Sequence, residues 1–125
     1  MTTSGIHEEV LRDPRYPVHQ IADRLLPYLK VLVEQFHPEK VILFGSYANG
    51  APDKHSDVDL LVVKDIEKSS VSEKRDILKA WRSLRWAHPP IPFELLVVSP
   101  SEHLERLARG GGFYSAITKQ GIRLA

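Results

Sequence analysis

The chain has 125 residues and a formal net charge of +1 at pH 7, so its length suits one domain with a single core. The near-neutral charge does not favour nucleic-acid binding through bulk electrostatic attraction. With no cysteine and six scattered histidines, the sequence offers neither a disulfide framework nor the ligand spacing of a structural zinc site.

The first residues, Met-Thr-Thr-Ser-Gly, do not resemble a signal peptide, because no basic segment followed by an apolar core is present. No apolar run approaches the length of about 18 residues typical of a membrane span. We therefore expect a soluble, cytoplasmic protein. Polar residues with proline breakers predict that residues 1–16 form a loosely held arm with one helical turn, and that residues 17–125 form the domain.

Residues 18–36 have the periodicity of an amphipathic helix. Their apolar side chains recur at spacings of three or four: Ile21, Leu25, Leu29, Leu32 and Phe36. Pro27 interrupts this pattern, and a proline inside a helix costs about 3 kcal/mol. We expect the helix either to kink or to begin again near Pro27.

A short apolar run over 40–44 stops at Gly45-Ser46, which predicts a buried strand followed by a tight turn. We expect Ser46 to cap a short helix after this turn. Backbone N–H groups at a helix start have no intrahelical acceptor, so a polyphosphate could be held there.

Asp57 and Asp59 stand at the start of the next apolar run, which ends at Val63. Because side chains alternate along a strand, both carboxylates would lie on one face, and Val58 between them would point into the core. Two neighbouring carboxylates repel each other unless a cation lies between them. Mg²⁺, which prefers hard oxygen ligands and often binds carboxylates together with substrate phosphates, is the natural candidate.

The loop between these two segments contains Asn49, Lys54 and His55. Its glycine and proline residues are typical of irregular surface backbone. Lys54 is either a solvated loop residue or a residue close to the triphosphate of a nucleotide.

The segment Ser70-Val-Ser-Glu73 matches a capping box and predicts a helix that reaches about Trp86. We expect Trp81 to lie in the core. Trp86, near the helix end, is either a packing residue or an exposed contact for a partner.

Glu94 stands inside the apolar run over 93–98, which predicts a third strand. A carboxylate in such a run is costly to bury without a compensating charge, so Glu94 either faces water on an edge strand or belongs to a site. Beside Gly45-Ser46 and the aspartate pair, we predict that it belongs to the site.

Ser99, Pro100 and Glu102 predict the capped start of a helix that runs to about Arg109. Three glycines at 110–112 would end it, and a last short helix is expected over 113–120. The order of elements predicts an α+β or α/β domain with a small mixed sheet flanked by helices.

Three motifs appear in order: Phe44-Gly45-Ser46, a ten-residue spacer to Asp57-x-Asp59, and Phe93-Glu94-Leu95. This arrangement, over roughly 38–100, resembles the minimal nucleotidyltransferases of the DNA polymerase β-like superfamily. The ending over 112–124 also resembles the tail of the short stand-alone members.

The resemblance implies transfer of a nucleoside monophosphate, from ATP or another nucleoside triphosphate, to a hydroxyl group by a two-metal mechanism. Asp57, Asp59 and Glu94 would then ligate Mg²⁺ and carry the chemistry. Gly45 and Ser46 would orient the β- and γ-phosphates, with Lys54 and Ser56 as further nucleotide contacts. This sequence departs from many relatives at two positions: Asn49 replaces a basic residue, and Glu94 replaces an aspartate.

The identity of the acceptor is a separate inference from the resemblance. Short stand-alone members resemble antitoxins that pair with a helical HEPN ribonuclease and attach AMP to its tyrosine, so a HEPN-type partner is expected. Two alternatives remain open: a binding module with a vestigial nucleotide site, and a transferase acting on a small hydroxylated molecule such as an aminoglycoside. The sequence leaves both a homo-oligomer and a hetero-oligomer open.

Overall fold

The structure is a computed structural model that describes residues 5–86 and 90–125, without the side chains of residues 85 and 86. Before the sheet come the helix α1 (Glu8–Leu11), the 3₁₀ helix η1 (Pro17–Ile21) and the helix α2 (Ala22–Phe36). Next come β1 (Lys40–Phe44), α3 (Ser46–Asn49), β2 (Val58–Val63), α4 (Ser70–Trp81) and the 3₁₀ helix η2 (Arg82–Trp86). The chain ends with β3 (Phe93–Val98), α5 (Pro100–Arg109), α6 (Gly112–Gln120) and β4 (Ile122–Arg123).

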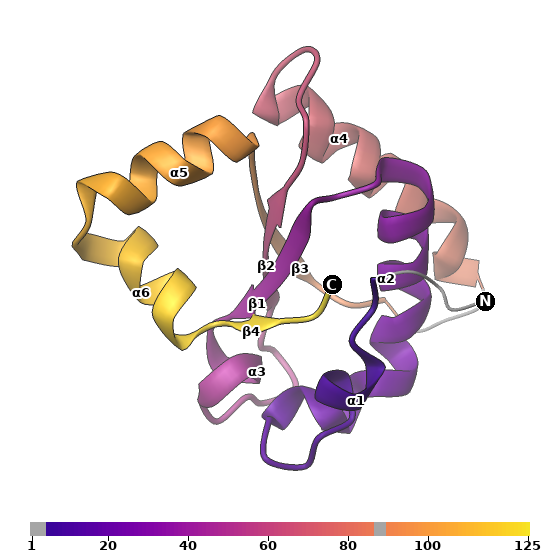
Figure 1. Cartoon of the computed structure of the whole chain (residues 1–125). Helices are drawn as coiled ribbons and strands as arrows, with labels where there is room; N and C mark the ends of the chain where they lie inside the picture. Colours follow the sequence, from indigo (N-terminus) through magenta and orange to yellow (C-terminus); the bar gives the residue numbers. More distant parts are fainter. Residues whose placement is uncertain (1–4, 87–89) are drawn as a thin grey trace.

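A four-stranded mixed sheet stands at the centre of the molecule, with strand order β3-β2-β1-β4 (Figure 1). Strands β2 and β3 are parallel, whereas β1 is antiparallel to both β2 and β4. The predicted α+β domain with a small mixed sheet is therefore confirmed. The sequence did not predict β4, whose two residues pair with Ile42 and Leu43 at the free edge of β1.

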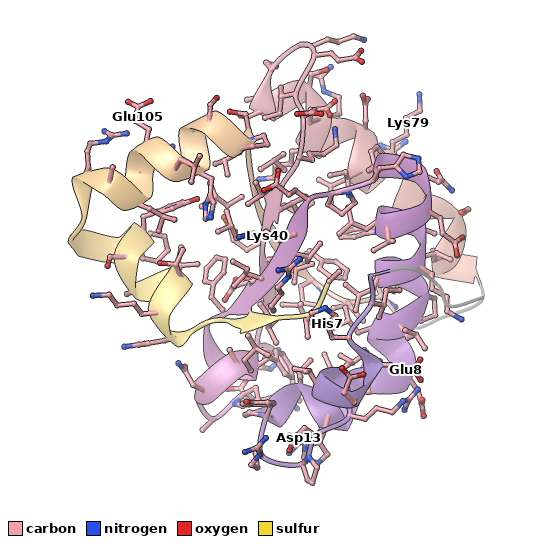
Figure 2. The ribbon with its side chains drawn as sticks, viewed as in Figure 1. His7, Glu8, Asp13, Lys40, Lys79 and Glu105 are labelled. Carbon is pink, nitrogen blue, oxygen red and sulfur yellow. The ribbon has the colours of Figure 1, made fainter. Side chains whose placement is uncertain are left out.

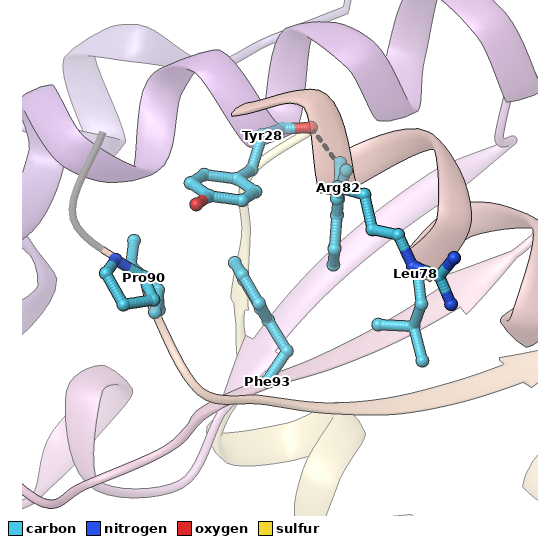
Figure 3. Close-up of a pocket in the computed structure, with 7 residues that line it drawn as sticks. Tyr28, Leu78, Arg82, Pro90 and Phe93 are labelled. Atoms are coloured by element: carbon cyan, nitrogen blue, oxygen red, sulfur yellow. Dashed lines mark hydrogen bonds between the residues drawn. The ribbon is translucent and has the colours of Figure 1, made fainter. Parts of the chain in front are cut away.

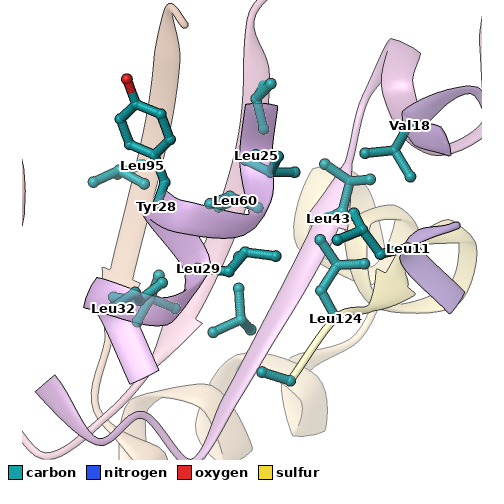
Figure 4. Close-up of a cluster of buried hydrophobic side chains, with 14 of the residues drawn as sticks. Leu11, Val18, Leu25, Tyr28, Leu29, Leu32, Leu43, Leu60, Leu95 and Leu124 are labelled. Atoms are coloured by element: carbon teal, nitrogen blue, oxygen red, sulfur yellow. The ribbon is translucent and has the colours of Figure 1, made fainter. Parts of the chain in front are cut away.

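Helices cover both faces of the sheet: α2 and α4 lie on one side, and α5 and α6 on the other (Figure 1). The main core lies between the sheet and α2 and α4 (Figure 4). A smaller cluster on the opposite face joins the sheet to α6; its buried members are Ile42, Leu61, Val63, Val98, Tyr114 and Ile117. Because side chains alternate along each strand, both faces can be apolar at once.

The two ends of the described chain pack together. The His7 backbone N–H donates to the Leu124 carbonyl at 2.7 Å, and the side chains of Leu11 and Leu124 are fully buried (Figures 2 and 4). The single helical turn expected before residue 17 is present as α1. The expectation of a loosely held arm is wrong for residues 5–16, because Leu11 belongs to the main core.

Pro27 lies inside α2, and the helix neither ends nor begins there. Of the two outcomes expected at Pro27, a new helix start is therefore wrong, and a kink stays a prediction. Leu25, Leu29 and Leu32 are fully buried along one face of α2. The burial of this apolar face offsets the local cost of the proline.

Two helix starts test the capping predictions. The Ser99 hydroxyl accepts from the Glu102 backbone N–H at 3.1 Å, as predicted for α5. Helix α4 is capped by Ser69 and not by Ser70: the Ser69 hydroxyl accepts from the Ser72 N–H at 3.0 Å.

Trp81 lies in the core, as predicted. It is 3% exposed, and its indole N–H donates to the Tyr28 carbonyl at 2.9 Å. The side chain of Trp86 lies outside the described residues, so its predicted role stays a prediction.

No helix in the described ranges is long and apolar enough to cross a membrane.

Candidate active site

The turn after β1 is built on the backbone of Gly45. Its φ of 78° and ψ of −158° fall in a region that is essentially restricted to glycine. Gly45 itself occupies the cap position of α3, and its carbonyl accepts from the Ala48 N–H at 3.0 Å. The prediction that Ser46 caps this helix is therefore wrong, because Ser46 is already its first residue.

Asp59 lies in the middle of the site. In the sheet register it stands opposite Phe44 of β1 on one side and opposite Glu94 of β3 on the other. Residues directly opposite each other in neighbouring strands project from the same face. This is the face covered by α6, whereas Val58 is fully buried on the other face, as predicted.

Gly45 and Asp59 are in close contact. A Cβ atom added to Gly45 would overlap the Asp59 carboxylate oxygen Oδ2. The missing side chain at Gly45 therefore makes room for the carboxylate. The glycine of the turn and the acid of β2 form one structural unit, which the order of the sequence motifs alone does not show.

The electrostatic surroundings of Asp59 include both other acidic residues of the site. Burial raises the pKa of Asp59, and the negative charges of Asp57 and Glu94 raise it further. Asp57 and Glu94 are exposed, whereas Asp59 is half-buried. The structure therefore brings the three predicted acids to one end of the sheet, where they form an acidic cluster open to solvent.

The chemistry of this acidic cluster fits a hard divalent cation. All three side chains offer carboxylate oxygens, which Mg²⁺ prefers, and a cation would relieve the repulsion that raises the pKa of Asp59. As the side chains stand, no group of three or more His, Cys, Asp or Glu residues in the described ranges is arranged to hold a metal ion. The metal-binding roles of Asp57, Asp59 and Glu94 stay predictions.

Lys54 and Ser56 belong to a turn that is held by its own side chains. The Ser56 hydroxyl accepts from the Asp53 N–H at 2.9 Å, and the Asp53 carboxylate accepts from the His55 N–H at 2.8 Å. Lys54 is exposed and forms no ion pair with any other described residue. The predicted nucleotide contacts of Lys54 and Ser56 stay predictions.

Sequence reasoning missed a pocket next to Gly45, here called the α6 pocket. It has a volume of about 160 Å³, and its lining includes Phe44, Gly45, Asn49, Phe113, Ile117 and Gln120. The ring centroids of Phe44 and Phe113 are 6.0 Å apart in an edge-to-face arrangement. No local signal could reveal this pocket, because it forms only when α6 folds back over β1.

A different cavity, of about 320 Å³, lies on the opposite face of the sheet (Figure 3). Tyr28, Trp81 and Phe93 contribute aromatic walls to it. Phe93 precedes Glu94 in β3, and neighbouring side chains of a strand point to opposite faces. This cavity is therefore separated from the acidic cluster by the sheet.

The fold and the acidic cluster can be compared with known protein families. Residues 25–103 match the family described as Nucleotidyltransferase domain, and this match includes Gly45, Ser46, Asp57, Asp59 and Glu94. The chain therefore belongs to this family.

A curated relative gives a more particular comparison. The chain is 49% identical over 41 residues to a protein of Methanocaldococcus jannaschii that bears the name "Putative protein adenylyltransferase MJ0141". The matched segment covers 33% of this chain and 40% of the length of that relative.

Proposed function

We propose that this chain transfers AMP from ATP to a protein hydroxyl group in a Mg²⁺-dependent reaction, and that the acceptor is a tyrosine of a HEPN-type toxin. The observation that carries the proposal is the position of Asp59, which lies against Gly45, opposite Glu94 in the sheet register, and close enough to Asp57 for that charge to raise its pKa. The name of the relative from Methanocaldococcus jannaschii, "Putative protein adenylyltransferase MJ0141", supports a protein acceptor. The chain would then act as an antitoxin, in the cytoplasm.

In this reaction the acceptor oxygen attacks the α-phosphorus of ATP, and the bond from that phosphorus to the oxygen bridging to the β-phosphate breaks. Pyrophosphate leaves, and AMP remains attached to the acceptor. Asp57, Asp59 and Glu94 would hold Mg²⁺, which supplies stabilisation of the charge that develops on the entering and leaving oxygens. Glu94 lies on β3, an edge strand of the sheet. It would take the proton of the attacking hydroxyl.

The turn at Gly45 would position the donor. The backbone N–H groups of Ser46 and Tyr47, at the start of α3, have no intrahelical acceptor and could donate to phosphate oxygens, whereas the Ala48 N–H already donates to the Gly45 carbonyl. Because Gly45 touches Asp59, phosphates held at the turn would lie beside the acidic cluster. The donor would thus be bound and oriented by two segments that the fold keeps in contact.

The test uses the full chain with a HEPN-type protein, which we expect a neighbouring gene to encode. The two proteins are incubated with Mg-ATP, and the intact mass of the partner is measured. We expect the mass to rise by one AMP and the modified peptide to carry it on tyrosine. Asp57→Asn, at an exposed position, should abolish the modification without unfolding the chain. An unmodified partner in a complex shown to form would contradict the proposal.

The same experiment separates the enzyme from a binding module. If Asp57→Asn neutralises the toxin as well as the natural chain does, contact alone accounts for the neutralisation. If neutralisation requires Asp57 and ATP, the transfer reaction accounts for it. Chelation of divalent cations with EDTA should have the same effect as Asp57→Asn.

A further inference from the structure

We propose that the α6 pocket binds the adenine base of the donor nucleotide. This inference rests on the proposed function and adds a base-binding site and a base preference to it. The pocket shares Gly45 with the candidate active site and lies under α6, on the same face of the sheet as Asp59. It is therefore adjacent to the position proposed for the phosphates.

The order of strands assigns the pocket to the donor side. Glu94, Asp59 and Phe44 stand opposite one another on β3, β2 and β1, and the α6 pocket continues from Phe44 away from Glu94. If Glu94 serves the attacking hydroxyl, the acceptor approaches from the β3 side. The space beyond β1 is then left for the donor nucleotide.

The lining of the pocket suits a flat ring better than a phosphate group. Phe44, Phe113, Ala116 and Ile117 provide apolar and aromatic surface, and its described lining contains no lysine or arginine. The Phe113 ring is 70% exposed, so it can stack on a base without first leaving the core. At about 160 Å³ the pocket is smaller than the roughly 300 Å³ needed for a drug-sized ligand, so it would hold one ring system.

Asn49 and Gln120 give the pocket its polar edge. The Asn49 side-chain N–H donates to the Gln120 backbone carbonyl at 3.4 Å, a long hydrogen bond that a ligand can replace. A carboxamide offers one donor and one acceptor together, which matches N7 and the N6 amino group of adenine. Guanine carries a carbonyl oxygen in place of that amino group, so we expect it to bind less tightly.

The test measures binding by isothermal titration calorimetry with Mg-ATP, Mg-GTP and Mg-tripolyphosphate. We expect the natural chain to bind ATP about 10-fold more tightly than tripolyphosphate, the effect of one stacked base. Ala116→Phe places a ring in the pocket from an exposed helix position, so it should reduce ATP affinity to that of tripolyphosphate. Tripolyphosphate affinity should not change. Ala108→Phe, at an exposed position of α5, is the matched control and should behave as the natural chain does.

A second variant tests the base preference. Asn49→Ala, at an exposed position, should bring the affinities for ATP and GTP within about 2-fold of each other, because the hydrogen-bond match to adenine is lost. Equal affinity for ATP and tripolyphosphate in the natural chain, or unchanged ATP affinity in Ala116→Phe, would overturn the inference and leave the proposed function in place. Failure of both ATP and tripolyphosphate to bind would contradict the inference and the proposed function together.

Discussion

The backbone of Gly45 lies directly against the carboxylate of Asp59, at a position where any Cβ atom would overlap the oxygen Oδ2. Gly45 has the φ of 78° and ψ of −158° that glycine adopts readily and other residues rarely adopt. Two requirements therefore meet at this residue, one of conformation and one of space. Both arise because the chain turns from β1 into α3 directly beside β2, the strand that carries Asp59.

Gly45→Ala should abolish nucleotide transfer and reduce the free energy of unfolding. Gly110→Ala is a matched control, because Gly110 has a similar φ of 67° and ψ of 174° but no atom within 4 Å of an added Cβ. Each variant carries about 1 to 3 kcal/mol of backbone strain. Only Gly45→Ala also displaces Asp59, so it should be the less stable variant in urea unfolding and the inactive one. Equal stability and activity of the two variants would show that the contact with Asp59 has no role.

Asp59→Asn should stabilise the chain in the absence of divalent cations. Burial and the charges of Asp57 and Glu94 raise the pKa of Asp59, so the folded chain binds a proton more readily than the unfolded chain does. Stability is therefore lost as the pH rises from the ordinary pKa of an aspartate to the raised value, and it stays lost at neutral pH. Removal of the charge opposite Glu94 should increase the free energy of unfolding by about 0.2 to 1 kcal/mol.

Thermal unfolding at neutral pH, with and without MgCl₂, measures this effect. Mg²⁺ should raise the Tm of the natural chain but not that of Asp59→Asn. Asp76→Asn, at an exposed position of α4, serves as the control and should leave both the Tm and the Mg²⁺ response unchanged. A lower Tm for Asp59→Asn without cations would contradict the repulsion between Asp59 and the charges of Asp57 and Glu94.

Local sequence patterns predicted the elements that local chemistry determines. The apolar runs predicted β1, β2 and β3, and Ser99 predicted the capped start of α5. The strand β4 was missed because two residues carry no periodicity, and β4 is stabilised by pairing with β1. In the same way, the contact of Asp59 with Gly45 and its pairing with Glu94 depend on strand order, which no local pattern specifies.

The start of α4 shows how a tertiary contact can move a helix cap from the residue that the sequence pattern predicts. Ser69 and Ser70 are chemically equivalent as caps, yet α4 begins after Ser69. Glu73, expected to complete the box with Ser70, instead forms an ion pair with the buried Lys64 at the end of β2. A buried ammonium group requires a charged partner, and this requirement outweighs the second hydrogen bond of a capping box.

Pro27→Ala should stabilise the chain. Pro27 has no N–H to donate to the Asp23 carbonyl one turn earlier in α2, so this helical hydrogen bond is missing. An alanine would restore the hydrogen bond and improve the helix propensity, which predicts a gain of up to about 3 kcal/mol. Urea unfolding measures the gain, with Gln35→Ala at an exposed position of α2 as a control expected to change stability by less than about 0.5 kcal/mol. A loss of stability would mean that packing of the half-buried proline ring matters more than the missing hydrogen bond.

The stability of the α5–α6 pair should depend on pH through His103. This side chain is 4% exposed, and its Nδ1 forms a hydrogen bond with the Tyr114 hydroxyl. Burial lowers the pKa of His103 below 6.5, and the charge of Lys40 lowers it further, whereas Glu39 has the opposite effect. The unfolded chain therefore binds a proton more readily, and stability is lost as the pH falls from 6.5 towards the lowered pKa.

Between about pH 7.5 and about pH 5.5, His103→Gln should lose less stability than the natural chain, because glutamine does not titrate. His55→Gln, at an exposed loop position, should retain the pH dependence of the natural chain. Urea unfolding at both pH values measures the difference, and NMR titration of the His103 ring protons measures its pKa directly. An ordinary pKa near 6.5 would mean that water reaches the ring, and that the contact between His103 and Tyr114 does not exclude solvent from the space between α5 and α6.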